Sequence, residues 1–309
     1  MAKIWQEDVT ALFEATGIQV LKPLLVSFNR ASYEFDKKVK ANWLYYAFLA
    51  FLKLALAIKH FDLVASVGAG SGLDGIAMYE TFRPKQLKLI DVNPAVIPIA
   101  DSNLRDYFTK VRAQLKWEAI LGNLCEPLEP ESADLVYGNI PTIPGDPSGI
   151  LDGMNSSSFY NPAWTKGAPK MLERSFLAHQ YEFFRQAHAA LKPTKPAVTA
   201  LGVRVAAPLV NELFQAAGFD GYEVIVLDLK EQSQSKAVVT AYAKQERARG
   251  VEFDFYREGA DTSILDSKPS LEAFKGSLEK WRVSAQEALT LVDAGQKVYH
   301  VIGILAGYK

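Results

Sequence analysis

The sequence has little that would support a disulfide framework, a zinc site or a nucleic-acid-binding surface. One of its 309 residues is a cysteine, Cys125, which excludes an internal disulfide and fits a reducing cytosol. The four histidines show no paired spacing, so we expect no metal site. A net charge of −1 argues against a nucleic-acid partner, although a local basic patch stays open.

A long apolar run is also lacking. Residues 43–58 read WLYYAFLAFLKLALAI, but this run is only about 16 residues long, is interrupted by Lys53 and falls short of the roughly 20 residues that cross a bilayer. We interpret it as a buried helix. The N-terminal stretch MAKIWQEDVTALFEATG carries acidic residues and no apolar core, unlike a signal peptide. We therefore expect a cytoplasmic protein that does not act on membranes.

What the sequence does have is a regular alternation of short strands and helices after a helical beginning. Apolar residues at helical spacing predict helices over residues 1–60. Strands are then expected at 62–67, 87–92, 117–121, 134–139, 197–203, 222–229 and 237–244. This alternation predicts an α/β fold with a doubly wound, mostly parallel, seven-stranded Rossmann-like sheet. The last two strands are joined only by KEQSQSK, so they should pair antiparallel.

The remaining segments suggest how the chain divides. Residues 172–192 predict one amphipathic helix, and residues 246–309 predict two strands, VEFDFYREG and KVYHVIGILAGY, with a helical stretch between them. That last part either covers one edge of the sheet or adds to it. The expected division is an N-terminal helical cap at 1–60, a core at 61–245 and a C-terminal extension packed on the core at 246–309.

A glycine-rich turn follows the first expected strand, in SVGAGSGLDG. Gly68, Gly70 and Gly72 lie between a strand and a helix, where a ligand can approach the backbone and the helix N-terminus closely. The pattern favours a nucleotide-type cofactor. Gly70, Gly72 and Gly75 also fit the dinucleotide pattern G-x-G-x-x-G, and a tight turn without a ligand is the plain alternative.

Polar residues end the next three expected strands. Asp91, in LIDVNP, is placed to accept hydrogen bonds from ribose hydroxyls, or else to cap the following helix, for which Asn93 before Pro94 is better suited. Asn123, in LGNLCEP, offers an oxygen to an adenine amino group. Asn139 begins NIPTIP at the fourth strand tip, where cofactor and substrate should meet. Its alternative role is to cap a turn.

The hexapeptide NIPTIP has a further property. Its two prolines stiffen the loop and remove backbone donors, which leaves carbonyl groups available as acceptors. An amide oxygen from Asn139 and a carbonyl fixed by proline together can orient an N–H donor.

Together these motifs resemble those of class I S-adenosylmethionine-dependent methyltransferases over residues 61–245. VGAGSG, the acid of LIDVNP, GNLCEP and DLVYGNIPTIP follow that family's order. NIPTIP is similar to the N-P-P-Y-I-P signature of amino and amide N-methyltransferases. The chain is more similar still to the methyltransferase module of methionine S-methyltransferase, in which segments like FDFYREG and VYHVIGILAGY follow the core. The resemblance implies S-adenosyl-L-methionine as cofactor, bound by Gly68, Gly70, Gly72, Asp91, Asn123 and Asn139.

The sequence also departs from that family. Ser66 stands where the family has an acid two residues before its first glycine, so the amino group of the cofactor needs another acceptor, such as backbone carbonyls or Asp74. Asn123 replaces the usual Asp. Ile140 and Thr142 replace a proline and the tyrosine that would stack on a flat base or amide. A flexible small acceptor is therefore expected.

Outside the strand tips, three features bear on catalysis. A positive sulfonium favours aromatic faces, and one or two of the aromatic residues at 5, 28, 33, 35, 43, 159, 160 and 164 are expected to supply them. SSSFYNPAW, at 156–164, is suited to be a lid. Arg204, after the strand AVTALGV, is suited to bind a substrate carboxylate or to form a surface salt bridge. The predicted catalytic set is Asn139, Tyr160 and Arg204.

Four functions stay open at this point. The first is methyl transfer to a small amine or thioether such as methionine. The second is cyclisation of S-adenosylmethionine to azetidine-2-carboxylate and methylthioadenosine, which an aromatic lid without a separate acceptor pocket would suit. The third is an NAD-dependent oxidoreductase that uses the overlapping glycine pattern, and the fourth is a binding protein without catalysis. The expected partner is a small molecule, and the sequence leaves the oligomeric state open, a homodimer included.

Overall fold

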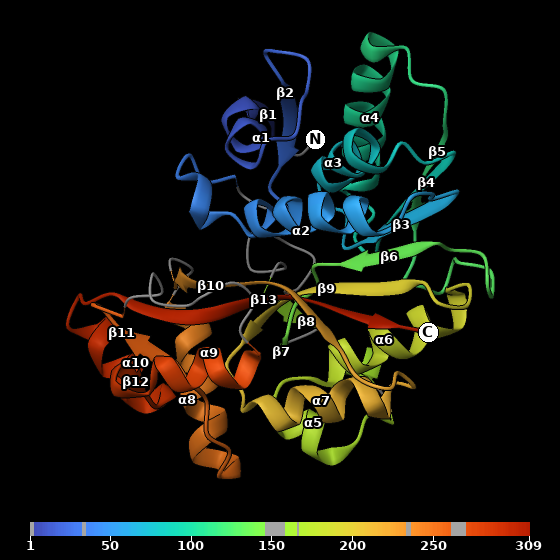
Figure 1. The fold of residues 1–309 in the computed structure, drawn as a ribbon. Helices are drawn as coiled ribbons and strands as arrows, with labels where there is room; N and C mark the ends of the chain where they lie inside the picture. Colours follow the sequence, from blue (N-terminus) through green and yellow to red (C-terminus); the bar gives the residue numbers. More distant parts are fainter. Residues whose placement is uncertain (1–2, 33–34, 146–157, 166, 233–235, 261–269) are drawn as a thin grey trace.

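The structure is a computed structural model, and it describes residues 3–32, 35–145, 158–165, 167–232, 236–260 and 270–309. A central nine-stranded sheet crosses the molecule, with helices packed on both of its faces (Figure 1). The predicted α/β class with a mostly parallel, doubly wound sheet is confirmed.

The parallel part of the sheet holds five neighbouring strands. Their spatial order is β5-β4-β3-β6-β9, so the chain moves outward from β3 in one direction and then returns to continue on the other side. β3 and β9 are buried along their whole lengths, which is why they read as continuous apolar runs. The five strands are β3 (Leu63–Val67), β4 (Gln86–Asp91), β5 (Lys116–Leu121), β6 (Leu135–Gly138) and β9 (Pro196–Val203).

The predicted strand at 237–244 is wrong, because these residues lie in the helix α8 (Lys236–Arg249). Its buried residues Val238, Val239, Tyr242 and Ala243 share one helical face, a periodicity that overrides the strand preference of valine and threonine. The antiparallel partner of β10 (Glu223–Glu231) is instead β13 (Val298–Tyr308), which lies between β10 and β9.

Residues 246–309 therefore add to the sheet. β13 completes the expected seven strands from the far end of the chain, and it pairs with β9 over eight residues. The short strands β11 (Phe255–Arg257) and β12 (Arg282–Val283) extend the same sheet at its edge. The three-part division of the chain stays a prediction.

Two apolar clusters cover the two faces of the sheet. The helices on one face are α2 (Trp43–Ala57), α3 (Leu73–Phe82) and α4 (Ile97–Val111) (Figure 1). The other face carries α5 (Lys170–Arg174), α6 (Ala178–Ala190), α7 (Ala207–Ala216), α8, α9 (Leu271–Ser277) and α10 (Ala285–Asp293). Among the described residues, no helix is long and apolar enough to cross a bilayer.

The N-terminal part is not entirely helical, which corrects the prediction for residues 1–60. α1 (Thr10–Thr16) lies between β1 (Ile4–Asp8) and β2 (Leu25–Asn29), which form a separate antiparallel pair. In β2, Val26 and Phe28 are buried and Leu25 is exposed, an alternation too short to stand out in the sequence. The Asn103 side chain of α4 bonds the backbone of Ser27 and so joins β2 to the core.

Two smaller predictions also need correction. The single helix expected at 172–192 is interrupted between α5 and α6, where Phe176 has a φ of 56°, a conformation that an α-helix cannot include. The helical stretch expected at 270–282 is α9 followed by the 3-10 helix η4 (Glu279–Trp281), and α10 was not anticipated. The other short elements are η1 (Val39–Ala41), η3 (Pro162–Thr165), β7 (Ile143–Pro144) and β8 (Phe159–Tyr160).

Candidate functional site

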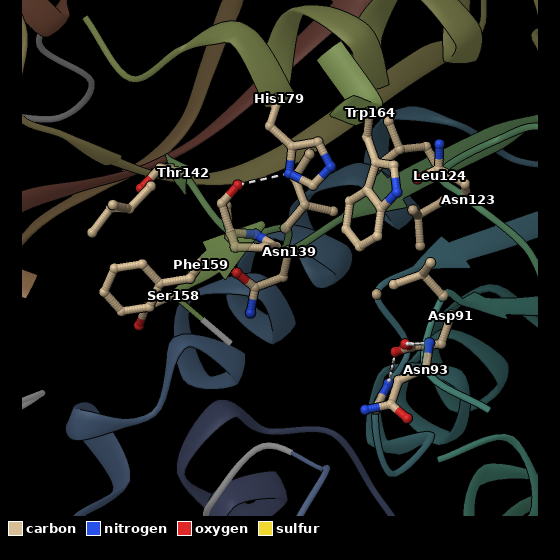
Figure 2. Close-up of a pocket in the computed structure, with 18 of the residues that line it drawn as sticks. Asp91, Asn93, Asn123, Leu124, Asn139, Thr142, Ser158, Phe159, Trp164 and His179 are labelled. Carbon is tan, nitrogen blue, oxygen red and sulfur yellow. Dashed lines mark hydrogen bonds between the residues drawn. The ribbon is translucent and has the colours of Figure 1, made fainter. Parts of the chain in front are cut away.

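A cavity lies at the carboxyl ends of the parallel strands, beside the point where the strand order reverses between β3 and β6 (Figure 2). In open α/β sheets this is where ligands bind. Most of the predicted site residues line it, namely Gly68, Gly70, Asp91, Asn123, Asn139 and Arg204. Gly72 and Tyr160 do not.

The glycine turn brings backbone close to the cavity. Gly68 has a φ of +73°, and a Cβ atom there would lie 3.0 Å from the backbone carbonyl oxygen of Asn139. Glycine is therefore needed both for the conformation and for the close approach of two strand ends. Gly72 has a different use. Its hypothetical Cβ would lie 3.3 Å from the backbone of Ala100 in α4, so it permits close packing of two helices.

Asp91 is anchored to the same turn. Its Oδ2 accepts a hydrogen bond from the Gly70 backbone N–H at 3.0 Å, and its Oδ1 accepts one from the Asn93 backbone N–H at 2.9 Å. Burial raises the pKa of the Asp91 carboxyl, and these backbone donors oppose that rise. Each oxygen keeps a lone pair for a ligand hydroxyl. Neither Asp91 nor Asn93 caps α4, which begins at Ile97 after Val96.

Asn139 has a free amide at the tip of β6. Its side chain makes no hydrogen bond with any described residue, and it lines the cavity. Figure 2 shows Asn139 and Asp91 on either side of the same open space. The backbone N–H of Asn139 bonds the Val67 carbonyl at 3.4 Å and so extends the strand pairing, and its side chain caps no turn among the described residues.

The carbonyl groups that follow Asn139 are held by α6. The Pro141 carbonyl oxygen lies 2.8 Å from His179 Nδ1, and the Ile140 carbonyl accepts from Gln180 Nε2 at 3.3 Å. The carbonyls thus act as acceptors, as predicted, but the side chains of α6 already occupy one acceptor position on each, and a ligand can use only the second. The prolines prevent the loop from bonding to itself, and the two α6 side chains bind it instead.

His179 is a cavity residue that the sequence analysis missed. A carbonyl oxygen can only accept, so Nδ1 carries the proton, and burial lowers the pKa of His179 to about 4. The ring is neutral at ordinary pH, and its Nε2 has no hydrogen-bond partner among the described residues. No spacing signal marks this residue, because its partner lies 38 residues earlier in the chain.

Contrary to the prediction, Tyr160 does not belong to the catalytic set. It is buried away from the cavity, and its ring stacks on that of His179 with 4.4 Å between centroids and 17° between planes. Three other aromatic residues line the cavity: Trp43, Phe159 and Trp164. Trp5, Phe28 and Phe35 do not line it, and position 33 lies outside the described residues. Of the expected lid at 156–164, residues 156 and 157 also lie outside the described residues, and Ser158, Phe159 and Trp164 line the cavity.

Asn123, Ser66 and Asp74 are less accessible to a ligand than the sequence suggested. Asn123 lines the cavity, and its Nδ2 donates to Glu126 Oε1 at 3.3 Å, which leaves its amide oxygen available. Ser66 is fully buried and donates to Asp74 Oδ2 at 3.0 Å. Neither Ser66 nor Asp74 lines the cavity, so Asp74 is not an acceptor for a ligand amino group. Burial raises the pKa of Asp74 to about 7.

Arg204 is the cationic group of the cavity. It is only 4% exposed, so the alternative of a surface salt bridge is wrong, and it forms no ion pair with a described residue. Its guanidinium lies over the rings of Tyr242 and Phe255, at 4.9 and 5.4 Å from their centroids. A buried guanidinium without a carboxylate partner is costly in an isolated protein.

Comparisons with known proteins add little to this site. No protein-family model matches the chain, and no curated protein matches it. Among solved structures, it is similar to phosphoethanolamine N-methyltransferase 2 of Haemonchus contortus, at 14% identity and a TM-score of 0.40, over 85% of this chain and 52% of that one. The chain thus spans about half the length of that protein.

For two further solved structures, the match covers a larger share of the other protein's chain. One is geranyl diphosphate C-methyltransferase from Streptomyces coelicolor A3(2), at 10% identity and a TM-score of 0.43, over 97% of this chain and 98% of that one. The other is the [4+2]-cyclase SpnF, at 13% identity and a TM-score of 0.40, over 97% and 92% of the two chains. Likenesses of this strength decide no function.

Proposed function

We propose that this protein is an S-adenosylmethionine-dependent enzyme that transfers a methyl group to a small acceptor, an amine or a thioether. The observation that carries this proposal is the common cavity of Asp91 and Asn139, which end strands on the two sides of β3 beside the glycine turn. The resemblance of the sequence motifs to class I methyltransferases assigns these same positions to an adenosyl ligand.

Different residues of the cavity bind different parts of the ligand. Asp91 accepts from the ribose hydroxyls, and Asn123 accepts from the adenine amino group, with Ile90 and Leu124 as apolar walls. Gly68 and Gly70 give the ligand room at the backbone. Bound S-adenosylmethionine supplies a methyl carbon that the sulfonium already activates.

Asn139 and the aromatic residues then act on the reacting atoms. The free Asn139 amide orients the acceptor so that its lone pair points at the methyl carbon, which is alignment of a kind that lowers the barrier. Trp43, Phe159 and Trp164 offer ring faces to the positive sulfonium and exclude water. The acceptor nitrogen or sulfur forms the new bond to carbon, and the carbon–sulfur bond breaks with its electron pair left on sulfur.

Cyclisation of S-adenosylmethionine is a second candidate, and one observation favours it. Neither Ser66 nor Asp74 lines the cavity, and Asp91 is assigned to the ribose, so no carboxylate at position 66 or 74 holds the amino group of the ligand as an ammonium ion. A neutral amine can attack the γ-carbon of its own chain. The carbon–sulfur bond then breaks, methylthioadenosine leaves with the electron pair, and the amine loses a proton.

The decisive experiment incubates the protein with S-adenosylmethionine, first alone and then with methionine or a panel of small amines. S-adenosylhomocysteine that forms only with an acceptor supports methyl transfer. Methylthioadenosine released without an acceptor supports cyclisation and removes methyl transfer as the main activity. Tighter binding of NAD than of S-adenosylhomocysteine would contradict both and favour an oxidoreductase.

A further inference from the structure

Three buried, nitrogen-bearing side chains stand next to one another across three neighbouring strands. Arg204 directly follows β9, His300 lies in β13 beside it, and Lys230 in β10 is the paired residue of His300. Their exposed fractions are 4%, 1% and 3%. We call these three residues the cation row.

The two cations of the row lie over aromatic rings but have no carboxylate partner among the described residues. Neither Arg204 nor Lys230 forms an ion pair there, and Lys230 Nζ reaches only the Glu231 carbonyl oxygen, at 3.4 Å. Arg204 donates to Gln232 Oε1, but no described residue is a hydrogen-bond partner of its Nε. Both ring nitrogens of His300 also lack a hydrogen-bond partner within the described ranges.

The electrostatics of the row favour an anionic ligand. Burial and the charge of Arg204 lower the pKa of Lys230 to about 8, although Asp36 and Glu231 oppose the shift. Burial and the same two cations hold the pKa of His300 well below its usual range. At neutral pH the row therefore holds two charges beside a neutral imidazole, and the carboxylate of Glu231 is already paired with Lys297 at 3.2 Å.

The row is connected to the cavity of the candidate site. Arg204 lines that cavity, and so does the Trp43 indole, which also contacts the other two members of the row. The Trp43 ring centroid is 5.6 Å from the His300 ring and 5.6 Å from Lys230 Nζ. Arg204 follows β9, which is three strand spacings from β4 and Asp91, or about 14 Å. An anion at Arg204 would thus lie well away from the ribose.

We propose that the cation row binds a carboxylate of the ligand, with Arg204 in direct contact and Lys230 and His300 behind it. This inference rests on the proposed function, because it assigns the class of the group that the same cavity recognises. A guanidinium matches a carboxylate through two parallel hydrogen bonds, and a second buried cation strengthens the attraction. The carboxylate belongs either to the methionyl part of S-adenosylmethionine or to a separate amino-acid-like acceptor.

The test measures binding and not turnover. Titration calorimetry on the full chain compares S-adenosylhomocysteine, which carries the methionyl carboxylate, with methylthioadenosine, which lacks it. Sodium acetate is then titrated at matched ionic strength into protein saturated with methylthioadenosine. Wild type is compared with Arg204→Met, Arg204→Lys and Lys230→Met, and the exposed Arg249→Met serves as the control.

Two results support the inference and distinguish the source of the carboxylate. If it is the cofactor's own, Arg204→Met weakens S-adenosylhomocysteine at least tenfold and leaves methylthioadenosine unchanged. If it belongs to an acceptor, both nucleosides bind as before, and acetate binding is lost in Arg204→Met. In either case Lys230→Met has a weaker effect of the same kind, and Arg204→Lys lies between wild type and Arg204→Met.

Other results would overturn one proposal and not the other. Unchanged affinities for all three probes in a folded Arg204→Met protein would refute the carboxylate site. If neither nucleoside binds to wild type, the proposed function fails. Acetate titrated into the free protein then still tests whether the cation row binds a carboxylate. A second readout is stability: Lys230→Met removes an unpaired buried charge, so it should raise the melting temperature of the free protein, and a lowered one would mean that Lys230 is structural.

Discussion

The Asp91 carboxylate and the Gly70 backbone N–H are joined by a 3.0 Å hydrogen bond that links the end of β4 to the turn after β3. The bond fixes one carboxylate oxygen with respect to the glycine turn, while the Asn93 backbone N–H fixes the other. Such a doubly anchored carboxylate presents its remaining lone pairs in a set geometry.

Asp91→Asn should therefore weaken ligand binding. An amide in this position turns one acceptor into a donor, which opposes either a backbone N–H or a ribose hydroxyl. We expect the dissociation constant of S-adenosylhomocysteine to rise roughly 10- to 100-fold, because hydrogen bonds to a charged acceptor contribute about 1.5–3 kcal/mol. Calorimetry measures this, with the exposed Asp106→Asn as control. An unaltered constant would refute the ribose role.

Asn139→Ala should impair turnover more than binding. The amide makes no hydrogen bond with a described residue, so its removal leaves the described protein contacts intact. We expect kcat to fall roughly 100-fold, as for a lost orienting group, with the affinity for S-adenosylhomocysteine changed less than about threefold. Steady-state kinetics and calorimetry on the same preparation separate the two effects. Wild-type kcat would remove Asn139 from the mechanism.

His179→Phe should release the loop that follows Asn139. The phenyl ring can keep the stacking on Tyr160, but it cannot donate to the Pro141 carbonyl. An unsatisfied buried carbonyl costs about 1–3 kcal/mol, so the melting temperature and kcat should both fall. His188→Phe is the matched control, since His188 lies on the same helix against Phe219 and away from the cavity. Equal effects in the two variants would argue against the loop-holding role.

Asp74 should make stability depend on pH. Burial raises its pKa from 3.8 to about 7, so between roughly pH 4 and 7 the folded state binds more protons than the unfolded state. Its contribution to stability is therefore lost as pH rises through this window. Asp74→Asn, which still accepts from Ser66, should stabilise the protein at pH 8 by up to about 4 kcal/mol and much less at pH 4. Denaturant unfolding at both pH values tests this, with Asp220→Asn as control.

Gly138→Ala should destabilise the core. A Cβ atom at this position would lie 2.7 Å from the ring of Phe183, which is completely buried and cannot move away. Overpacking of this kind costs about 1–3 kcal/mol. Gly276→Ala provides the contrast, because nothing lies within 4 Å of its hypothetical Cβ in α9, and there alanine should stabilise by roughly 0.5–1 kcal/mol. Chemical unfolding measures the stability of both variants. A Gly138→Ala protein that is more stable than Gly276→Ala would contradict the prediction.

Much of the fold was predictable because it is encoded in local patterns. The alternation of apolar runs and amphipathic segments marks β3, β4, β5, β6 and β9, and the helices between them. One readable signal was overlooked: Ser284 and Glu287 form the capping box that begins α10. By contrast, valine and threonine in α8 favoured the wrong element, because local propensity competes with burial of one helical face.

The sequence by itself determined that Asp91, Asn123 and Asn139 would share a cavity, since parallel strands bring their carboxyl ends to the same edge of the sheet. Only the tertiary structure decided that β13 lies between β9 and β10, that Tyr160 stacks behind His179, and that Arg204 is buried with no carboxylate partner in the described part of the chain. These facts depend on contacts between segments far apart in the chain. No local pattern encodes which distant side chain will cover, or fail to neutralise, another.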